Sequence, residues 1–454
     1  MSEQRIDAAL RDATDTETVT IGPGVLATVD DVFAKSFGDQ PAVLVADENT
    51  FAVAGQEVQQ RLEAAGRSLQ ESYVFPREPT LYAEYGNIEK LVAALRAHDA
   101  IPIAVGSGTV NDIVKRAAHE CDRRYLCVGT AASMDGYTSF GASIAKDGYK
   151  QTLTCPAPRA VLADVTVLTH APPPMTASGY ADLLAKITAG ADWLLADALE
   201  IETINSQVWS LVQEPLREAT GRPAELSAGD PDAMEGLIEG LIMSGLAMQA
   251  AASSRPASGA EHQFSHLWEM EGLGHDDHPP LSHGFKVGVG SIAIAALYER
   301  VLECDLTDID VDAIRAAWPS REEVEPAVRA EHTTPGLDDA AVKESLAKYC
   351  DADQIAQRLT LLGECWPQLR ERLREQLLSA ERLREMLQAA GCPTHPSEIG
   401  LDMAAFKATY RRAGMIRRRY TILDMATEAG ILEKCVEDVF APGGFWAGDP
   451  GRQA

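Results

Sequence analysis

PIAVGSGTVNDIVKRAA, residues 102–118, decides the fold class, because an apolar run meets a glycine-rich turn and then a helical pattern. Gly106 and Gly108 let the backbone approach a pyrophosphate closely, and the helix beginning near Thr109 offers unpaired amides and the positive end of its dipole. The six-residue dinucleotide fingerprint is incomplete, since Asn111 stands where its third glycine would be. A tight strand-to-helix turn without any ligand is the competing interpretation.

The same alternation of strand and helix extends on both sides of this turn. Apolar runs predict strands at QPAVLVAD (40–47), SYVFP, IPIAVGSG and RYLCVGT, with one more extended pair in TCPAPRAVLADVTVLTH around 153–170. Helical patterns lie between them at GQEVQQRLEAAG (55–66), NIEKLVAALRAHDA and TVNDIVKRAAHE. Such alternation predicts a parallel sheet with crossover helices, that is, an α/β dinucleotide-binding domain over residues 1–172.

After APPPM at 171–175 the pattern becomes helical throughout, which predicts an all-α domain over residues 173–454. The stretch LIEGLIMSGLAMQAAASS (237–254) is apolar but carries Glu239 and Ser244, so we expect a buried helix rather than a membrane span. The amphipathic, heavily charged stretch at 366–391 favours an outer helix packed on its own domain over a dimer contact.

Composition limits the classes of protein that remain. A chain of 454 residues is long enough for two domains. The formal charge of −28 argues against a general binder of nucleic acid or anionic membranes, and a phosphate-bearing ligand would need a local basic or amide-lined pocket. The polar start MSEQRIDAALRDATD has no signal-peptide core, and 8 scattered cysteines without a CxxC pair indicate reduced thiols. We therefore expect a cytoplasmic protein.

Five of the 10 histidines lie in EHQFSHLWEMEGLGHDDHPPLSHG, residues 261–284. A helix over this segment would place His262 and His266 on one face, and His283 could supply a third nitrogen. Two histidines at this spacing also occur on packed or solvated faces. His275 and His278 lie in a Gly- and Pro-rich stretch, where a surface loop is favoured over spare metal ligands.

A second loop, CVGTAASMDGYTSFGAS (127–143), also follows a predicted strand and is rich in small residues, with Asp135 as its single acid. Because the carboxyl ends of parallel strands meet at one edge of a sheet, this loop and the Gly106–Gly108 turn should face the same crevice. Together with the histidines, these loops indicate that the protein binds a nucleotide and a metal.

Five motifs in order resemble a known family: GSGTVND, GTAASMDGYTS, TASGYADLLAK, SGAEHQFSH and LSHG. They are similar to those of the sn-glycerol-1-phosphate dehydrogenases, in the dehydroquinate synthase-like and iron-containing alcohol dehydrogenase-like superfamily. IRRRYTILDMATEAGILEK near the C-terminus is similar to the bacterial branch. The resemblance runs from about residue 20 to 440, and it implies a dehydroquinate synthase-like fold.

The resemblance also implies roles for individual residues. Asp182, His262 and His283 match the metal ligands of the family, while His266 and Asp135 match positions that contact substrate, and Asp182 is also counted with these catalytic residues. Asp47 is a weaker match for a contact to the adenosine ribose. The remaining matches are to the loops that bind NAD or NADP: Gly106, Gly108, Thr109, Val110, Asn111, Asp112, Thr130, Ala131, Ala132, Ser133 and Ser139.

Two departures from the family pattern stand out. Relatives commonly have three glycines where this chain has Gly106-Ser107-Gly108, a mild change because backbone amides do the binding. They also have an HGE motif where this chain has His283-Gly284-Phe285, so the usual glutamate beside the histidine is missing.

The expected function follows from the donor set and the resemblance together. One carboxylate and two imidazoles leave open positions on a divalent ion, as a Lewis-acid catalyst needs, and nickel, zinc and iron all accept these ligands. The resemblance implies NAD(P)-linked interconversion of dihydroxyacetone phosphate and sn-glycerol 1-phosphate by a homo-oligomer, expected to be a dimer. A dehydroquinate synthase-like sugar-phosphate cyclase and a non-catalytic sugar-phosphate sensor remain alternatives, which net turnover of the cofactor would separate.

Overall fold

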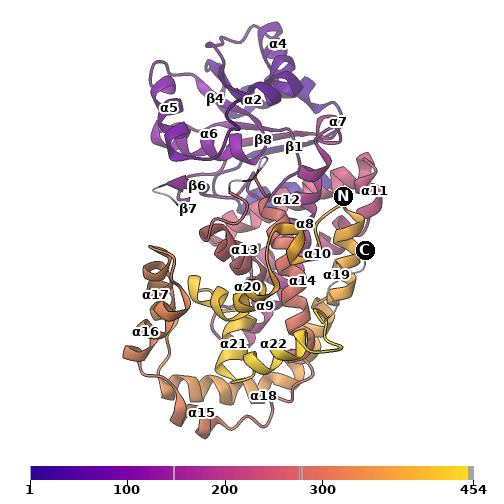
Figure 1. The fold of residues 1–454 in the computed structure, drawn as a ribbon. Helices are drawn as coiled ribbons and strands as arrows, with labels where there is room; N and C mark the ends of the chain where they lie inside the picture. Colours follow the sequence, from indigo (N-terminus) through magenta and orange to yellow (C-terminus); the bar gives the residue numbers. More distant parts are fainter. Residues whose placement is uncertain (1, 147–148, 276, 278–279, 448–454) are drawn as a thin grey trace. The chain divides into compact units, whose positions relative to one another are not determined.

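The computed structural model describes residues 2–146, 149–275, 277 and 280–447 (Figure 1). Residue contacts divide the chain into two compact units. The first comprises Met1–Leu184, Gln207–Ala257 and Ala389–Cys392, and the second comprises Ala185–Ser206, Ser258–Gln388 and Pro393–Ala454.

The first unit is built on six parallel strands in the order β1-β8-β5-β4-β2-β3, which confirms the predicted parallel sheet. The strand β1 was not predicted, and the extended pair expected around 153–170 contributes only β8 to this sheet. The central strands are buried along almost their whole length, as expected for a parallel sheet covered on both faces. An antiparallel hairpin of two further strands stands apart from this sheet. The strands are β1 (Thr18–Gly22), β2 (Ala42–Asp47), β3 (Tyr73–Phe75), β4 (Ile101–Gly106), β5 (Leu126–Gly129), β6 (Ala142–Lys146), β7 (Tyr149–Leu153) and β8 (Ala160–Asp164).

Helices connect these strands, in indigo to magenta in Figure 1, and α8, α10, α11 and α12 complete the first unit. Val105, Leu126 and Leu162 from the sheet share one buried apolar cluster with Phe33 and Val58 from the helices. The helices are α1 (Ser2–Asp12), η1 (Val25–Thr28), α2 (Val29–Phe37), α3 (Glu48–Thr50), the π-helical η2 (Phe51–Gly55), α4 (Gln56–Ala64), α5 (Tyr85–Leu95), α6 (Gly108–Glu120), α7 (Val165–Leu168), α8 (Pro173–Leu184), α10 (Ser206–Ala219), α11 (Pro223–Ser227) and α12 (Pro231–Ala251).

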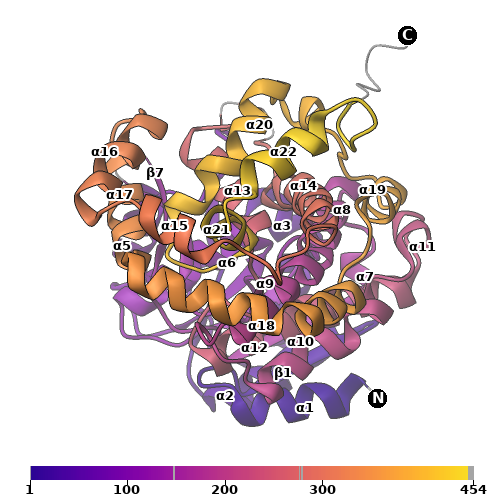
Figure 2. The ribbon, with the colours of Figure 1, turned by 90° about the horizontal axis from the view of Figure 1, so that it is seen from below.

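Within its described residues, the second unit contains helices joined by loops and no strands. In Figure 2, α16 and α17 lie side by side, and they pack against each other. The helices are α9 (Lys186–Ala198), α13 (Ala260–Met270), α14 (His283–Val301), α15 (Val311–Ala317), α16 (Arg321–Glu331), α17 (Leu337–Lys348), α18 (Ala352–Gln376), α19 (Ala380–Ala389), η3 (Pro396–Ile399), α20 (Met403–Arg412), η4 (Ala413–Ile416), α21 (Ile422–Glu428) and α22 (Leu432–Phe440).

The predicted fold class, an α/β N-terminal part followed by helices, is confirmed. The last strand of the sheet ends at Asp164 and α8 begins at Pro173, although a domain boundary near 172 stays a prediction. The apolar stretch 237–254 lies mainly in α12, whose residues from Leu237 to Gln249 are buried. Within the described part of the chain, no helix is both long and apolar enough to cross a membrane.

Two local predictions differ from the structure because a side chain caps a helix. The extended segment expected through VTVLTH ends at Asp164, whose carboxylate accepts a hydrogen bond from the Thr166 amide at 2.9 Å and starts α7. The stretch 366–391 is two helices rather than one. The Ser379 hydroxyl accepts a hydrogen bond from the Arg382 amide at 3.1 Å, which starts α19 after the break that follows α18.

Candidate active site

Three histidines lie together in the second unit, at the junction of two packed helices. His262 and His266 come from α13, and His283 is the first residue of α14, which packs against α13. The ring centroids are 6.0 Å apart for His262 and His266, 5.5 Å for His262 and His283, and 5.8 Å for His266 and His283. The i, i+4 spacing therefore does place two imidazoles on one helix face, and the start of α14 supplies the third.

A carboxylate fixes the orientation of each of two rings. Nδ1 of His262 lies 2.7 Å from Oε1 of Glu261, and Nδ1 of His283 lies 2.9 Å from Oε1 of Glu269. A ring whose Nδ1 is held by a carboxylate presents Nε2 as its acceptor, which is the usual arrangement of a metal-ligating histidine. Although Phe285 stands at the position of the relatives' glutamate, a carboxylate, that of Glu269, lies beside His283.

Glu261 is completely buried, and its charge is stabilised by hydrogen bonds. Burial raises the pKa of this carboxyl, but the hydrogen bond and charge of His262 and the amide of Gly259 outweigh burial, so that the pKa is lowered overall. The same carboxylate accepts a hydrogen bond from the Thr188 hydroxyl at 2.9 Å. An ionised Glu261 keeps a negative charge beside His262 and increases the basicity of its ring.

His266 has a different environment from the other two rings. Burial lowers its pKa well below the ordinary value, and the positive charge of Arg417 lowers it further. The ring is therefore neutral near pH 7, with one nitrogen that donates and one that accepts a hydrogen bond.

In the first unit, two predicted site carboxylates are linked. Asp182 lies on α8 with an exposed fraction of 1%, and its Oδ2 accepts a hydrogen bond from the Asp135 amide at 3.0 Å. The Asp135 carboxylate in turn accepts a hydrogen bond from the Ser244 hydroxyl at 2.9 Å, from α12. The second loop therefore orients Asp182 through its backbone.

Packing favours glycine in this turn, most strictly at position 106, where the close atom belongs to a branched side chain rather than to the end of a flexible one. A Cβ on Gly106 would lie 2.5 Å from Cβ of Val110, and one on Gly108 would lie 2.8 Å from Cε of Met134. Gly106 is paired with Gly129 on the neighbouring strand, so both loops leave adjacent carboxyl ends of the sheet. The first amides of α6 have no acceptor within the helix, which leaves them available to an anion.

The side chains of α6 hold the second loop in place. The amine of Lys115, which is 1% exposed, donates to the carbonyls of Gly136, Ser139 and Gly141 at 2.8, 2.9 and 3.1 Å. Asn111 accepts a hydrogen bond from the Tyr125 hydroxyl at 2.9 Å. The Lys115 contacts hold the second loop against α6, whereas the Asn111 contact fixes α6 to the residue that precedes β5.

Other cofactor-loop residues predicted from the sequence have structural partners too. Asp112 accepts a hydrogen bond from the Ser143 amide at 3.1 Å, and Thr130 donates its amide to the Gly106 carbonyl at 3.1 Å. Asp47 caps α3 by accepting from the Thr50 amide at 2.8 Å. The remaining members of the predicted set, Thr109, Val110, Ala131, Ala132, Ser133 and Ser139, lie in the same turn or loop.

Three residues of this region are not evident from motif reading, although helical spacing gives a signal for two. Lys115 follows Asn111 by four residues on α6, and Glu269 follows His266 by three on α13, which places each pair on one helix face. No spacing rule identifies Glu261. Of the two loop histidines, His275 is exposed and His278 lies outside the described residues.

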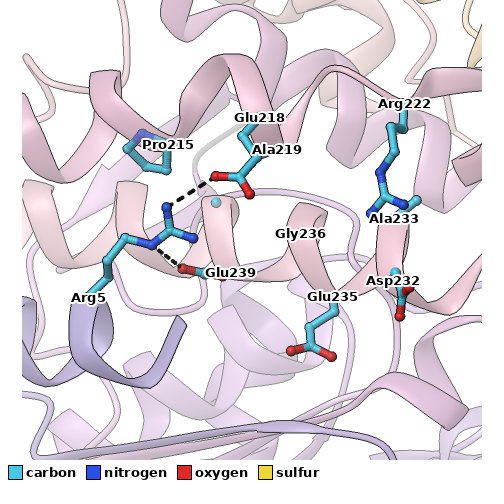
Figure 3. Close-up of a pocket in the computed structure, with 11 residues that line it drawn as sticks. Arg5, Pro215, Glu218, Ala219, Arg222, Asp232, Ala233, Glu235, Gly236 and Glu239 are labelled. Carbon is cyan, nitrogen blue, oxygen red and sulfur yellow. Dashed lines mark hydrogen bonds and ion pairs between the residues drawn. The ribbon is translucent and has the colours of Figure 1, made fainter. Parts of the chain in front are cut away.

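A separate pocket in the first unit lies among α1, α10 and α12 (Figure 3). In it Arg5 pairs with Glu239, with Nε and Oε1 3.1 Å apart, and with Glu218, with NH1 and Oε2 3.4 Å apart. None of the predicted site residues lines this pocket, so it is not the candidate active site.

Comparison with known proteins finds relatives that are dehydrogenases. The family model described as iron-containing alcohol dehydrogenase matches residues 20–172. The chain is 31% identical to a glycerol-1-phosphate dehydrogenase (NAD(P)+) of Geobacillus thermodenitrificans, over 86% of this chain and 87% of that protein. It is 38% identical to one of Halalkalibacterium halodurans, but over 57% of this chain and 64% of the relative's length.

Solved structures agree on the fold. A probable glycerol dehydrogenase from Sinorhizobium meliloti matches with a TM-score of 0.60 and 14% identity, covering 93% of this chain and 96% of the other. Identity at this level indicates a common fold and leaves the substrate open.

Proposed function

The chain belongs to the glycerol-1-phosphate dehydrogenase family, and we propose that it interconverts dihydroxyacetone phosphate and sn-glycerol 1-phosphate with NAD(H) or NADP(H) and one divalent metal. The relatives' names give the substrate and the cofactor type, and the family model gives a metal. The observation that carries the proposal is the pair His262 and His283, whose Nδ1 atoms are each held by a glutamate.

The metal would be held by Asp182, His262 and His283, a described group with the donor types for one ion. Two imidazoles with Nε2 presented, and a buried carboxylate already oriented by the Asp135 amide, fit a divalent ion that keeps open positions for substrate. When bound, such an ion supplies Lewis acidity, which polarises a ketone and favours the alkoxide form of the alcohol in the reverse direction. Nickel, zinc and iron all suit this donor set.

The cofactor would bind at the two loops that leave β4 and β5. We assign the pyrophosphate to the Gly106–Gly108 turn, where the first amides of α6 can donate to its oxygens. Lys115 holds the second loop against α6, and Thr130 to Ser133 and Ser139 belong to that loop. Asp47, at the end of the adjacent strand β2, stays a prediction for the ribose contact. A nicotinamide dinucleotide supplies the hydride.

His266 and Asp135 would contact the substrate. A neutral His266 can both accept and donate a hydrogen bond, which suits a group that orients a substrate oxygen and moves a proton. Asp135, held by Ser244, would accept a hydrogen bond from a substrate hydroxyl.

The test identifies the product and measures the rate of the reaction. Protein incubated with dihydroxyacetone phosphate and NADH should form sn-glycerol 1-phosphate, which an enzyme specific for sn-glycerol 3-phosphate will not oxidise. Activity should disappear with a chelator and in His262→Ala, and it should persist in His275→Ala, which removes an exposed histidine from the same segment. Product of the opposite configuration, or full activity in His262→Ala, would contradict the proposal.

A further inference from the structure

Three consecutive arginines follow η4, and the structure gives them different surroundings. Arg418 is fully paired with Glu344, with Nε and Oε2 3.0 Å apart and NH2 and Oε1 2.9 Å apart. Arg419 donates from NH1 to the Ser258 carbonyl at 2.8 Å. Within the described residues, Arg417 has no carboxylate at ion-pair distance, and its hydrogen bond to the preceding carbonyl of Ile416 is long, at 3.5 Å.

Arg417 is close to the histidine cluster. It directly follows η4, which packs against α13, the helix that carries His262 and His266. Its side chain is partly buried, and burial lowers the pKa of its guanidinium even though the charges of Glu344 and Glu269 act in the opposite direction. At neutral pH the guanidinium remains charged. A positive charge therefore lies near His266, and no described carboxylate lies within ion-pair distance of it.

Two other cations near this cluster, Lys286 and Arg412, have anionic partners. Lys286 lies 3.5 Å from Oε1 of Glu269, and Arg412 is bonded to Glu271 and to the Glu331 carbonyl. Arg417 therefore differs from its neighbours in having donors without a close anionic partner.

A phosphate is the anion that best suits these donors. The guanidinium is a planar fork that binds phosphate oxygens in pairs and is desolvated at lower cost than an ammonium group. A chain with a formal charge of −28 repels an anionic substrate over most of its surface, so a local cation is needed where the phosphate binds.

We propose that Arg417 binds the phosphate group of the substrate beside His266 and thereby selects phosphorylated over free dihydroxyacetone. This inference rests on the proposed function, because it assigns one part of that substrate to one residue. It predicts that the contribution of Arg417 disappears when the phosphate is absent from the substrate.

The experiment compares two ketones that differ only in the phosphate. With NADH and a fixed metal, kcat/KM is measured for dihydroxyacetone phosphate and for dihydroxyacetone. Arg417→Ala should lower kcat/KM for the phosphorylated ketone about 10- to 100-fold, the usual loss for a charged hydrogen-bonding partner. For dihydroxyacetone the change should stay below about threefold. Arg417→Lys should fall between, since it keeps the charge and loses the fork.

Arg418→Ala is the matched control, because it removes a neighbouring arginine that is bonded to Glu344. It should leave the ratio of the two kcat/KM values at the wild-type level. Equal losses for both ketones in Arg417→Ala, or no loss for dihydroxyacetone phosphate, would overturn the proposal.

Direct binding of inorganic phosphate separates this inference from the proposed function. Calorimetry on the metal-loaded protein should show phosphate binding that weakens at least about tenfold in Arg417→Ala and by less in Arg417→Lys, which retains the positive charge. If wild-type protein reduces neither ketone, the proposed function fails, and the phosphate titration still tests Arg417. Equal phosphate affinity in wild type and Arg417→Ala would refute the assignment.

Discussion

Replacing Glu261 by glutamine should weaken metal binding without altering the shape of the site. Oε1 of Glu261 lies 2.7 Å from Nδ1 of His262 and 2.6 Å from the Gly259 amide, and Oε2 accepts from the Thr188 hydroxyl. A glutamine can keep its carbonyl oxygen at the first position and donate its amide to Thr188, whose hydroxyl also donates to the Ala185 carbonyl at 2.9 Å. The substitution therefore removes mainly the negative charge.

The expected loss can be estimated from the role of the carboxylate. Removing a hydrogen-bonding partner of a ligating histidine typically costs 10- to 100-fold in metal affinity, or about 1.4–2.8 kcal/mol. The assay is competition between the protein and a chromophoric chelator for nickel or zinc, with the melting temperature of the metal-free protein measured in parallel. Glu271→Gln serves as the control, because Glu271 follows the same helix but is bonded to Arg412.

The metal affinity and the melting temperature together show whether Glu261 acts on metal binding or only on the stability of the fold. A metal dissociation constant within about twofold of the wild-type value in Glu261→Gln, with a lowered melting temperature of the metal-free protein, would refute the reasoning. Glu261 would then serve only to anchor the start of α13.

Four further substitutions test the remaining assignments. Asp182→Ala or His262→Ala should lose the ion, because two ligands hold a divalent metal poorly; stoichiometric metal by elemental analysis with normal turnover would move the site elsewhere. Gly108→Val should weaken NADH binding in a fluorescence titration and spare the metal, since its side chain would enter the space above the turn and meet Met134; loss of metal with normal NADH affinity would refute this. His266→Ala should keep metal and cofactor but lower kcat/KM for dihydroxyacetone phosphate by about 10²–10⁴-fold, whereas a lowered melting temperature with unchanged kinetics would mark a structural histidine.

The fold was accessible from the sequence because its signals are local. The buried run before Gly106 and the helical pattern after Thr109 both follow from spacing along the chain, and the structure has β4 and α6 there. The helix that places His262 and His266 on one face was accessible for the same reason. Helix boundaries set by single caps, such as Ser379 before α19, are a weaker signal and were missed.

The partners of the site residues depend on contacts between distant segments. Glu269 reaches His283 across 14 residues, and Lys115 reaches the Gly141 carbonyl across 26, so no periodic pattern records either contact. The position of Phe285 is an example. The sequence shows only that the glutamate of relatives is missing next to His283-Gly284, whereas the structure shows the carboxylate of Glu269, from α13, at Nδ1 of His283.

The most direct test of the central claim is stopped-time NADH or NADPH oxidation by metal-free wild-type protein that has been refilled with nickel, zinc or iron. With dihydroxyacetone phosphate, we predict net oxidation with at least one of these metals, at one cofactor consumed per ketone reduced. If neither cofactor is oxidised with any of the three metals, the dehydrogenase assignment fails, and a cyclase that recycles its cofactor or a non-catalytic sensor takes its place.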